Sequence, residues 1–127
     1  MEQAAKIQPK HPAVLLALGR LELAKGNYAR AVILLEESRE GGEESATLYS
    51  ELGEAYSQLK QWGKAASVLE RALQRQHRNT GWRLLQAKAL GQLGRTREAE
   101  IKYREVLAID PSSSQAWKGL KSLGEKY

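Results

Sequence analysis

Two histidines, several paired carboxylates and one glycine-rich segment are the residues of this chain whose types could carry chemistry. A histidine or a carboxylate can act as a general acid or base when a partner group positions it. His11 and His77, however, fall in predicted turns, where a histidine is most often an ordinary surface residue. Glu36-Glu37 and Glu43-Glu44 fall where a solvated helix face and a loop are expected. We therefore predict no catalytic residues, no metal site and no cofactor.

The glycine-rich segment Gly91-Gln92-Leu93-Gly94-Arg95 does not have the context of a phosphate-binding loop. Such a loop follows a β-strand, and no run of alternating β-branched residues predicts a strand here. Cysteine is absent from the sequence, which excludes disulfides, zinc–thiolate sites and cysteine nucleophiles. We conclude from the sequence that the chain is not an enzyme.

The elements that must position these residues are helices. The 127 residues include 20 Lys+Arg and 15 Asp+Glu, for a net charge of +5, and strong helix formers such as Ala, Leu, Glu, Gln, Lys and Arg dominate. No run of about 18 apolar residues is present, so membrane insertion is not expected. The composition predicts an all-α, soluble chain and leaves the cytoplasm and the bacterial periplasm open as compartments.

A repeat of 34 residues runs through the chain. Leu18-Gly19 recurs as Leu52-Gly53 and, in weakened form, as Gln86-Ala87. Closely packed helices need small residues where their backbones cross, so the recurring Gly and Ala predict stacked helix pairs. Two further sets of residues share the same offset: Ala31, Ala65 and Ala99, and Leu35, Leu69 and Tyr103.

This pattern resembles the tetratricopeptide repeat (TPR) family, whose unit is a helix–turn–helix of that length. The first copy departs from the family pattern at Glu22 and Ser38, and the third departs at Gln86 and Val106. The resemblance implies an all-α solenoid of three stacked TPR helix–turn–helix units plus a C-terminal capping helix. The units are placed at residues 12–45, 46–79 and 80–113, and the capping helix at 114–127. The second copy matches best, through Leu52, Gly53, Tyr56, Ala65, Leu69 and Ala72.

The helix spacing also predicts which residues are buried and where helices begin. Ser45 is predicted to cap the first helix of the second unit, and Ser112 with Gln115 has the pattern of a capping box for the last helix. Helical periodicity predicts a buried stripe in the first unit. Its members are Leu15, Leu18, Leu21, Val32 and Leu35.

Both ends of the chain continue the repeat register. Residues 1–11 are interpreted as the tail of a preceding repeat helix, because Pro9 falls at the position of Pro111. We therefore expect a fragment of a longer TPR protein with Met1 added, the alternative being a native N-terminal cap. The first unit would then present an apolar N-terminal face through which copies could self-associate. Lys121 stands where a full repeat needs a small residue, so the last helix is expected to close the stack.

TPR proteins usually bind a ligand in the groove lined by the first helix of each unit, and this expectation is carried over position by position. Arg20, Glu54 and Lys88 occupy equivalent positions, which would suit a peptide with a central basic residue. The alternative is an exposed face without a ligand. The predicted groove residues are Leu16, Arg20, Leu23, Ser50, Glu54, Ser57, Gln58, Leu84, Lys88 and Gln92.

One family binding mode is not expected. The positions with which some TPR domains grip the C-terminal carboxylate of heat-shock chaperones hold a single basic residue here, Arg20, and Glu51 would repel a carboxylate. The other three positions hold Leu16, Gly81 and Leu85.

Basic residues also recur on the second helices of the units. We interpret them as a solvated outer face, with polyanion binding as the alternative. Nucleic acid is not expected as a partner, because Trp62 and Tyr103 fall at core positions and do not interleave with the charges. The residues are Arg71, Arg75, Arg78, Arg95, Arg97, Lys102 and Arg104.

The leading functional hypothesis from the sequence is a non-catalytic interaction scaffold that binds a protein or peptide partner in its groove. The alternatives are an architectural spacer in a larger bacterial envelope assembly or polymer-export protein, and a polyanion-binding module that uses the outer basic residues.

Overall fold

The computed structural model describes residues 11–125 of the chain. The predicted repeat tail at residues 1–11 lies outside the described residues, except for His11. Seven helices and no strand occupy the described part, which confirms the predicted all-α class. They are α2 (Pro12–Ala24), α3 (Tyr28–Glu40), α4 (Ala46–Gln58), α5 (Trp62–Arg75), α6 (Thr80–Gln92), α7 (Thr96–Ile109) and α8 (Ser114–Glu125).

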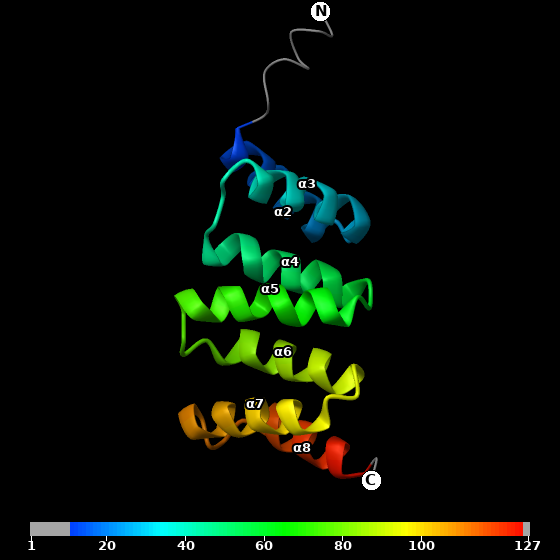
Figure 1. Cartoon of the computed structure of the whole chain (residues 1–127), viewed down its shortest axis with the longest axis vertical. Helices are drawn as coiled ribbons and strands as arrows, with labels where there is room; N and C mark the ends of the chain where they lie inside the picture. The colour runs from blue at the N-terminus through cyan, green and yellow to red at the C-terminus, as the bar shows by residue number, and fades with distance from the viewer. Residues whose placement is uncertain (1–10, 126–127) are drawn as a thin grey trace, which may run out of the picture.

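The helices form antiparallel pairs stacked along one axis, as the ladder in Figure 1 shows. Each helix contacts the next along the chain, and α2, α4, α6 and α8 also contact one another in succession. No such contact joins α3, α5 and α7. Because helices on the inner side of a curved stack lie closer together, α2, α4, α6 and α8 are the inner helices that line the concave face. The outer helices are α3, α5 and α7.

Glycines allow the two helices of a unit to approach each other. A Cβ atom on Gly19 would lie 2.7 Å from the Leu35 side chain, and one on Gly53 would lie 2.5 Å from Leu69 Cγ. Both distances are below any real Cβ contact, so only glycine fits at these crossings. The third unit has Ala87 at the equivalent position, and it is fully buried.

Side chains and turn residues determine where the helices begin. Ser45 Oγ accepts a hydrogen bond from the Leu48 N–H (3.1 Å), as the sequence predicted. The prediction for the last helix is wrong by one residue, because Ser113 Oγ is the cap and accepts from the Ala116 N–H (3.2 Å). Ser112 instead donates from its N–H and its hydroxyl to Asp110 Oδ1 (3.2 and 2.8 Å), because it belongs to the preceding turn.

The turn inside each unit contains one residue with positive φ. Gly26 and Gly94 fill this position in the first and third units, with φ of 84° and 80°. The second unit places Lys60 there, with φ of 60°. A side chain at positive φ is strained, so the second turn is held by its surroundings at a local energetic cost.

The predicted buried stripe of the first unit is only partly correct. Leu15 and Leu35 are buried, and Val32 packs against the core. Leu18 and Leu21, by contrast, are 37% and 51% exposed. The equivalent residues of the second unit, Leu52 and Ala55, are fully buried on α4, which packs against α3. Leu18 and Leu21 are exposed because no described helix packs on that side of α2.

Candidate partner-binding groove

The concave face contains two hollows, one near each end of the stack. The first opens between α2 and α4 and has a volume of about 470 Å³. Its floor is apolar through Leu21 and Leu23, and its rim is charged through Arg20, Glu51 and Glu54. The hollow can therefore accept an apolar stem that ends in a charged group.

The charged side chains of the first hollow do not neutralise one another completely. The Arg20 guanidinium lies 3.3 Å from Glu51 Oε1 and donates a hydrogen bond to it. Burial raises the pKa of the Glu51 carboxyl above its ordinary value, the Arg20 guanidinium lowers it, and the Glu54 carboxylate raises it. Glu54 is exposed and has no ion pair within the described chain. The hollow thus offers one free carboxylate and favours a basic ligand group.

The second hollow opens between α6 and α8, with a volume of about 510 Å³. Leu84 and Leu85 make part of its wall, and Lys88 and Lys118 supply two positive charges with no carboxylate among the lining residues. Tyr103 forms part of the base, and burial raises the pKa of its phenol, which keeps it neutral. This hollow therefore favours an acidic ligand group.

The structure brings together half of the ten predicted groove residues in these hollows. Arg20, Leu23 and Glu54 line the first, and Leu84 and Lys88 line the second. Leu23 is 8% exposed and lines the first hollow.

The other five predicted residues lie outside the hollows. Ser57 is buried and its hydroxyl has no hydrogen-bond partner within the described chain, so it offers little contact surface. Leu16 packs against the core, and the Ser50 hydroxyl donates to the Thr47 carbonyl on its own helix. Gln58 and Gln92 are exposed on the inner helices and line neither hollow.

Sequence reasoning did not place two charged groups in the groove. From the sequence, Glu51 is expected only to repel a carboxylate, yet it pairs with Arg20 and so leaves the Glu54 carboxylate unbalanced in the first hollow. Lys118 lies on α8, which was assigned only a capping role. Extending the groove positions of the repeat into the last helix would have identified Lys118, because it is equivalent to Leu16 and Ser50.

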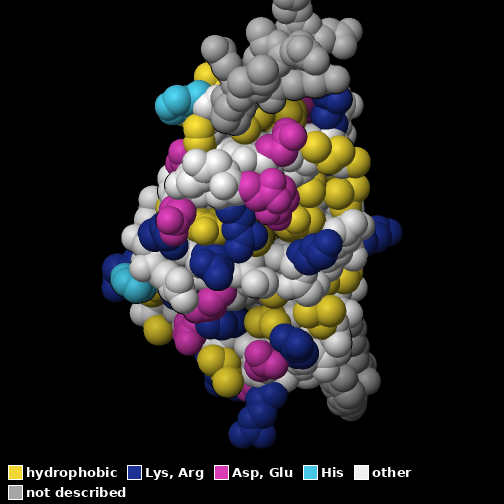
Figure 2. Space-filling view, turned by 45° about the horizontal axis from the view of Figure 1, so that its top comes forward, with side chains coloured by type: hydrophobic (Ala, Val, Ile, Leu, Met, Phe, Trp, Pro, Cys, Tyr) yellow, Lys and Arg dark blue, Asp and Glu magenta, His cyan; other side chains and the backbone are white. Residues whose placement is uncertain are grey.

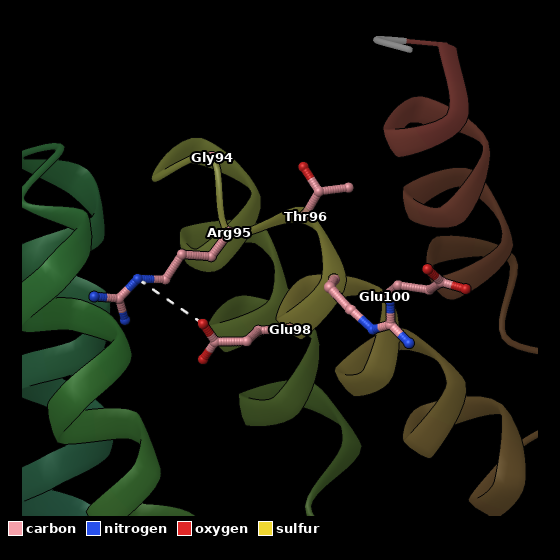
Figure 3. A pocket seen from close by; sticks show the side chains of 6 residues that line it. Gly94, Arg95, Thr96, Glu98 and Glu100 are labelled. Atoms are coloured by element: carbon pink, nitrogen blue, oxygen red, sulfur yellow. Dashed lines mark ion pairs between the residues drawn. The ribbon is translucent and has the colours of Figure 1, made fainter.

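A third hollow, at the turn between α6 and α7, follows the glycine-rich segment (Figure 3). Arg95 and Glu98 form an ion pair across it, with Arg95 Nε 4.0 Å from Glu98 Oε1. Glu100 also borders this opening. Arg97 lines it as well, so two arginines and two carboxylates balance at this site and leave no net positive charge for an anion.

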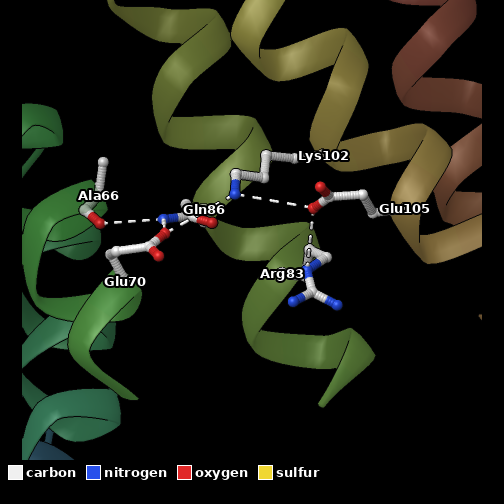
Figure 4. Close-up of polar contacts among 6 residues, drawn as sticks. All are labelled: Ala66, Glu70, Arg83, Gln86, Lys102 and Glu105. Atoms are coloured by element: carbon white, nitrogen blue, oxygen red, sulfur yellow. Dashed lines mark hydrogen bonds and ion pairs between the residues drawn. The ribbon is translucent and has the colours of Figure 1, made fainter. Parts of the chain in front are cut away.

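A polar network joins α5, α6 and α7 (Figure 4). Gln86 stands where the first two units have Leu18 and Leu52, and its amide donates to the Ala66 carbonyl (3.3 Å) and to Glu70 Oε1 (2.8 Å). The buried Gln86 carbonyl oxygen has no donor within the described chain. The network is completed by ion pairs of Lys102 with Glu70 (3.7 Å) and with Glu105 (3.6 Å), and of Arg83 with Glu105 (3.3 Å).

The outer basic residues are largely paired on α7. Besides Lys102, Arg104 pairs with Glu100 (2.8 Å) and Arg95 with Glu98. Figure 2 shows one face on which Lys and Arg side chains gather over the middle, with acidic side chains among them. A continuous basic stripe along α7 is therefore not present.

Two family models match the chain, both described as tetratricopeptide repeat. One matches residues 13–78 and the other residues 50–114. No curated protein matches the sequence. No helix within the described residues is long and apolar enough to cross a membrane.

Solved structures with the same fold include three whose names mention TPR. The Arabidopsis OM64 TPR domain is 22% identical over 91% of this chain and 96% of its own, with a TM-score of 0.80. The first TPR of Spaghetti (RPAP3), bound to the HSP90 peptide SRMEEVD, is 21% identical over 94% of each chain, with a TM-score of 0.80. YrrB, described as a TPR protein with an unusual peptide-binding site, is 23% identical over 91% of this chain and 59% of its own, with a TM-score of 0.87.

Proposed function

The chain belongs to the tetratricopeptide repeat family, and from this premise we propose that it is a non-catalytic scaffold that holds a peptide segment of a protein partner in its concave groove. The predicted groove residues are the basis of this proposal. The repeats supply the surface, and the groove side chains select the peptide.

The observation that carries the proposal is the opposite charge of the two groove hollows. Glu51 and Glu54 make the hollow between α2 and α4 acidic, and Lys88 and Lys118 make the hollow between α6 and α8 basic. Complementary charges give specificity and register more than affinity. A peptide with a basic side chain near α4 and an acidic group near α6 and α8 fits this arrangement in one direction only.

Peptide binding by relatives of the same fold supports the proposal. The Spaghetti TPR structure contains an HSP90 peptide, and YrrB is described by its peptide-binding site. We do not propose the chaperone tail as the partner of this chain. The positions at which some TPR domains grip the C-terminal carboxylate of such a tail hold Leu16, Gly81 and Leu85 here, and none of these can pair with a carboxylate.

The proposal is tested by selecting peptides from a random library on three proteins. The wild type is expected to enrich Lys or Arg at one position, and Glu54→Lys should lose that enrichment. Arg97→Glu is the matched control, because Arg97 is an exposed residue of α7 without an ion pair within the described chain. Circular dichroism checks that all three fold. The same enrichment on wild type and Glu54→Lys would contradict the groove proposal, and no enrichment on any protein would favour the spacer.

The exposed apolar residues of α2 support a second proposal, self-association. Val14, Leu18 and Leu21 occupy positions that are buried by a neighbouring helix in the second unit. Static light scattering over a concentration series is expected to show growth of the wild-type particle that Val14→Glu removes, since Val14 is exposed and lines neither groove hollow. A wild type that stays monomeric at millimolar concentration would contradict this proposal.

A further inference from the structure

Three arginines converge on one tyrosine ring at the outer side of the stack. The guanidinium carbons of Arg39, Arg71 and Arg75 lie 5.5, 5.8 and 4.9 Å from the centre of the Tyr49 ring. Tyr49 belongs to the inner helix α4 and is almost completely buried, whereas the arginines come from the outer helices α3 and α5. Residues from two units therefore build this arginine cluster.

The charges around the cluster do not balance. Arg39 lies 3.5 Å from Glu36, and Arg75 lies 3.5 Å from Glu44. Arg71 has no carboxylate within ion-pair distance in the described chain. Each guanidinium is attracted to the electron-rich face of the ring, which holds the three like charges near one another. The cluster therefore retains a positive excess centred on Arg71.

One guanidinium group of the cluster is oriented by a hydrogen bond, and all three arginine side chains are accessible to solvent. Arg75 Nη1 donates to the Arg71 carbonyl (3.1 Å), which orients the guanidinium of Arg75. About a third of the Arg39 and Arg75 side chains is exposed, and Arg71 is exposed as well. All three guanidinium groups are therefore accessible to an anion in solvent.

We propose that Arg39, Arg71 and Arg75 bind one phosphate group, presented by a phosphorylated side chain of a protein partner. Guanidinium groups match phosphate oxygens with paired donors, and a phosphate monoester carries up to two charges and three acceptor oxygens. Glu36 already pairs with Arg39, and Glu44 already pairs with Arg75. A further carboxylate, with its single charge, would therefore bind the cluster less strongly than a phosphate.

The surroundings of the cluster argue against nucleic acid. A nucleic acid backbone needs a row of free cations, because its affinity comes from many phosphate contacts. Arg95, which precedes α7, and Lys102 and Arg104 on α7 pair with carboxylates, so that Arg97 is left without an ion pair within the described chain and α7 does not present a row of free cations. The cluster thus gathers three guanidinium groups around one ring with one excess positive charge, which fits one phosphate group rather than a polymer.

The site is separate from the groove. Its arginines lie on α3 and α5, and none of them lines either groove hollow. Phosphate binding here can therefore succeed or fail independently of peptide binding in the groove. A partner that uses both sites would be regulated by its phosphorylation state.

The test follows the arginine side-chain N–H signals by NMR during titrations with inorganic phosphate, a phosphoserine peptide and the same peptide without phosphate. The phosphoserine peptide is expected to shift the signals of the cluster, and the unphosphorylated peptide to leave them unchanged. Arg71→Gln should weaken phosphopeptide binding by about tenfold or more. Arg97→Gln is the matched control and should leave binding unchanged, because it removes the same charge from an exposed outer helix.

Three results would overturn the proposal. Equal weakening by Arg71→Gln and Arg97→Gln would show that only net charge matters. Binding of inorganic phosphate without the phosphopeptide would show that the anion is free rather than part of a partner. No change of the arginine signals with either probe would show that the cluster only covers Tyr49. Arg71→Lys, which keeps the charge and loses the paired donors, is expected to bind with intermediate affinity.

Discussion

The first and second repeat units share the same sequence pattern, but equivalent residues of the two units differ in how deeply they are buried. Leu18 and Leu21 on α2 are exposed, and their equivalents Leu52 and Ala55 on α4 are fully buried. The difference teaches that a unit buries only one side of its own first helix. The helix of a neighbouring unit buries the other side, as expected where each repeat contacts only its neighbours.

The other end of the stack shows the complementary case, in which the second helix of the same unit is missing from the described chain. Trp117 on α8 is 57% exposed, whereas Tyr49 at the equivalent position of α4 is 2% exposed. No second helix follows α8 within the described chain. The Trp117 indole N–H is satisfied by the Pro111 carbonyl (3.0 Å), so only apolar surface is left open.

The largest expected effect is a difference in unfolding free energy between equivalent leucine truncations in the first and second units. Leu52→Ala should lower the free energy of unfolding by about 2–5 kcal/mol, because a fully buried leucine leaves a cavity. Leu18→Ala should cost about 1 kcal/mol, because part of that side chain is already in water. Urea unfolding followed by circular dichroism measures both. Equal losses would break the comparison, since they would mean that Leu18 is covered in solution.

A second prediction concerns the close helix crossing in the second unit. Gly53→Ala should cost about 1–3 kcal/mol, because the added methyl group overlaps Leu69. Gly63→Ala is the matched control, since nothing lies near its added carbon and alanine favours the helix by about 0.5–1 kcal/mol. Thermal unfolding of the two variants should therefore shift in opposite directions. Shifts of the unfolding temperature in the same direction would argue against a close contact between Gly53 and Leu69.

A third prediction extends the comparison to the third unit. Gln86→Leu restores the residue that Leu52 provides in the second unit and removes the unpaired carbonyl oxygen of Gln86. We expect the variant to be more stable by about 1 kcal/mol in urea unfolding. A loss of stability would instead show that the bonds from Gln86 to Ala66 and Glu70 hold α6 in place.

The repeat period was enough to predict the helices, and it predicted the small residues at the crossings. It could not predict the burial of Leu18, because exposure depends on what packs outside the unit. It also missed pairs of residues from different helices, such as Arg20 with Glu51, since equivalent positions say nothing of side-chain direction. The arginine cluster was missed for the same reason: Arg39 and Arg71 belong to different units and meet only at Tyr49.

The smallest predicted effect concerns the turns. Lys60→Gly should stabilise the protein by about 0.5 kcal/mol, because relief of the left-handed strain outweighs the entropy that glycine adds to the unfolded chain. Lys60→Ala is the control, since alanine keeps the strain and should give no gain. Differential scanning calorimetry resolves the two. A gain with alanine would show that the lysine side chain, not its backbone, is the source of strain.

The contacts of the described helices join only neighbours or next neighbours along the chain. Local opening should therefore begin at the ends, with amide protons of α2 and α8 exchanging with solvent before those of α4 and α5. A peptide that touched both groove hollows would link α2 and α4 to α6 and α8, which the chain itself connects only in steps. Such a ligand would slow hydrogen exchange at both ends together, because it contacts α2 in one hollow and α8 in the other.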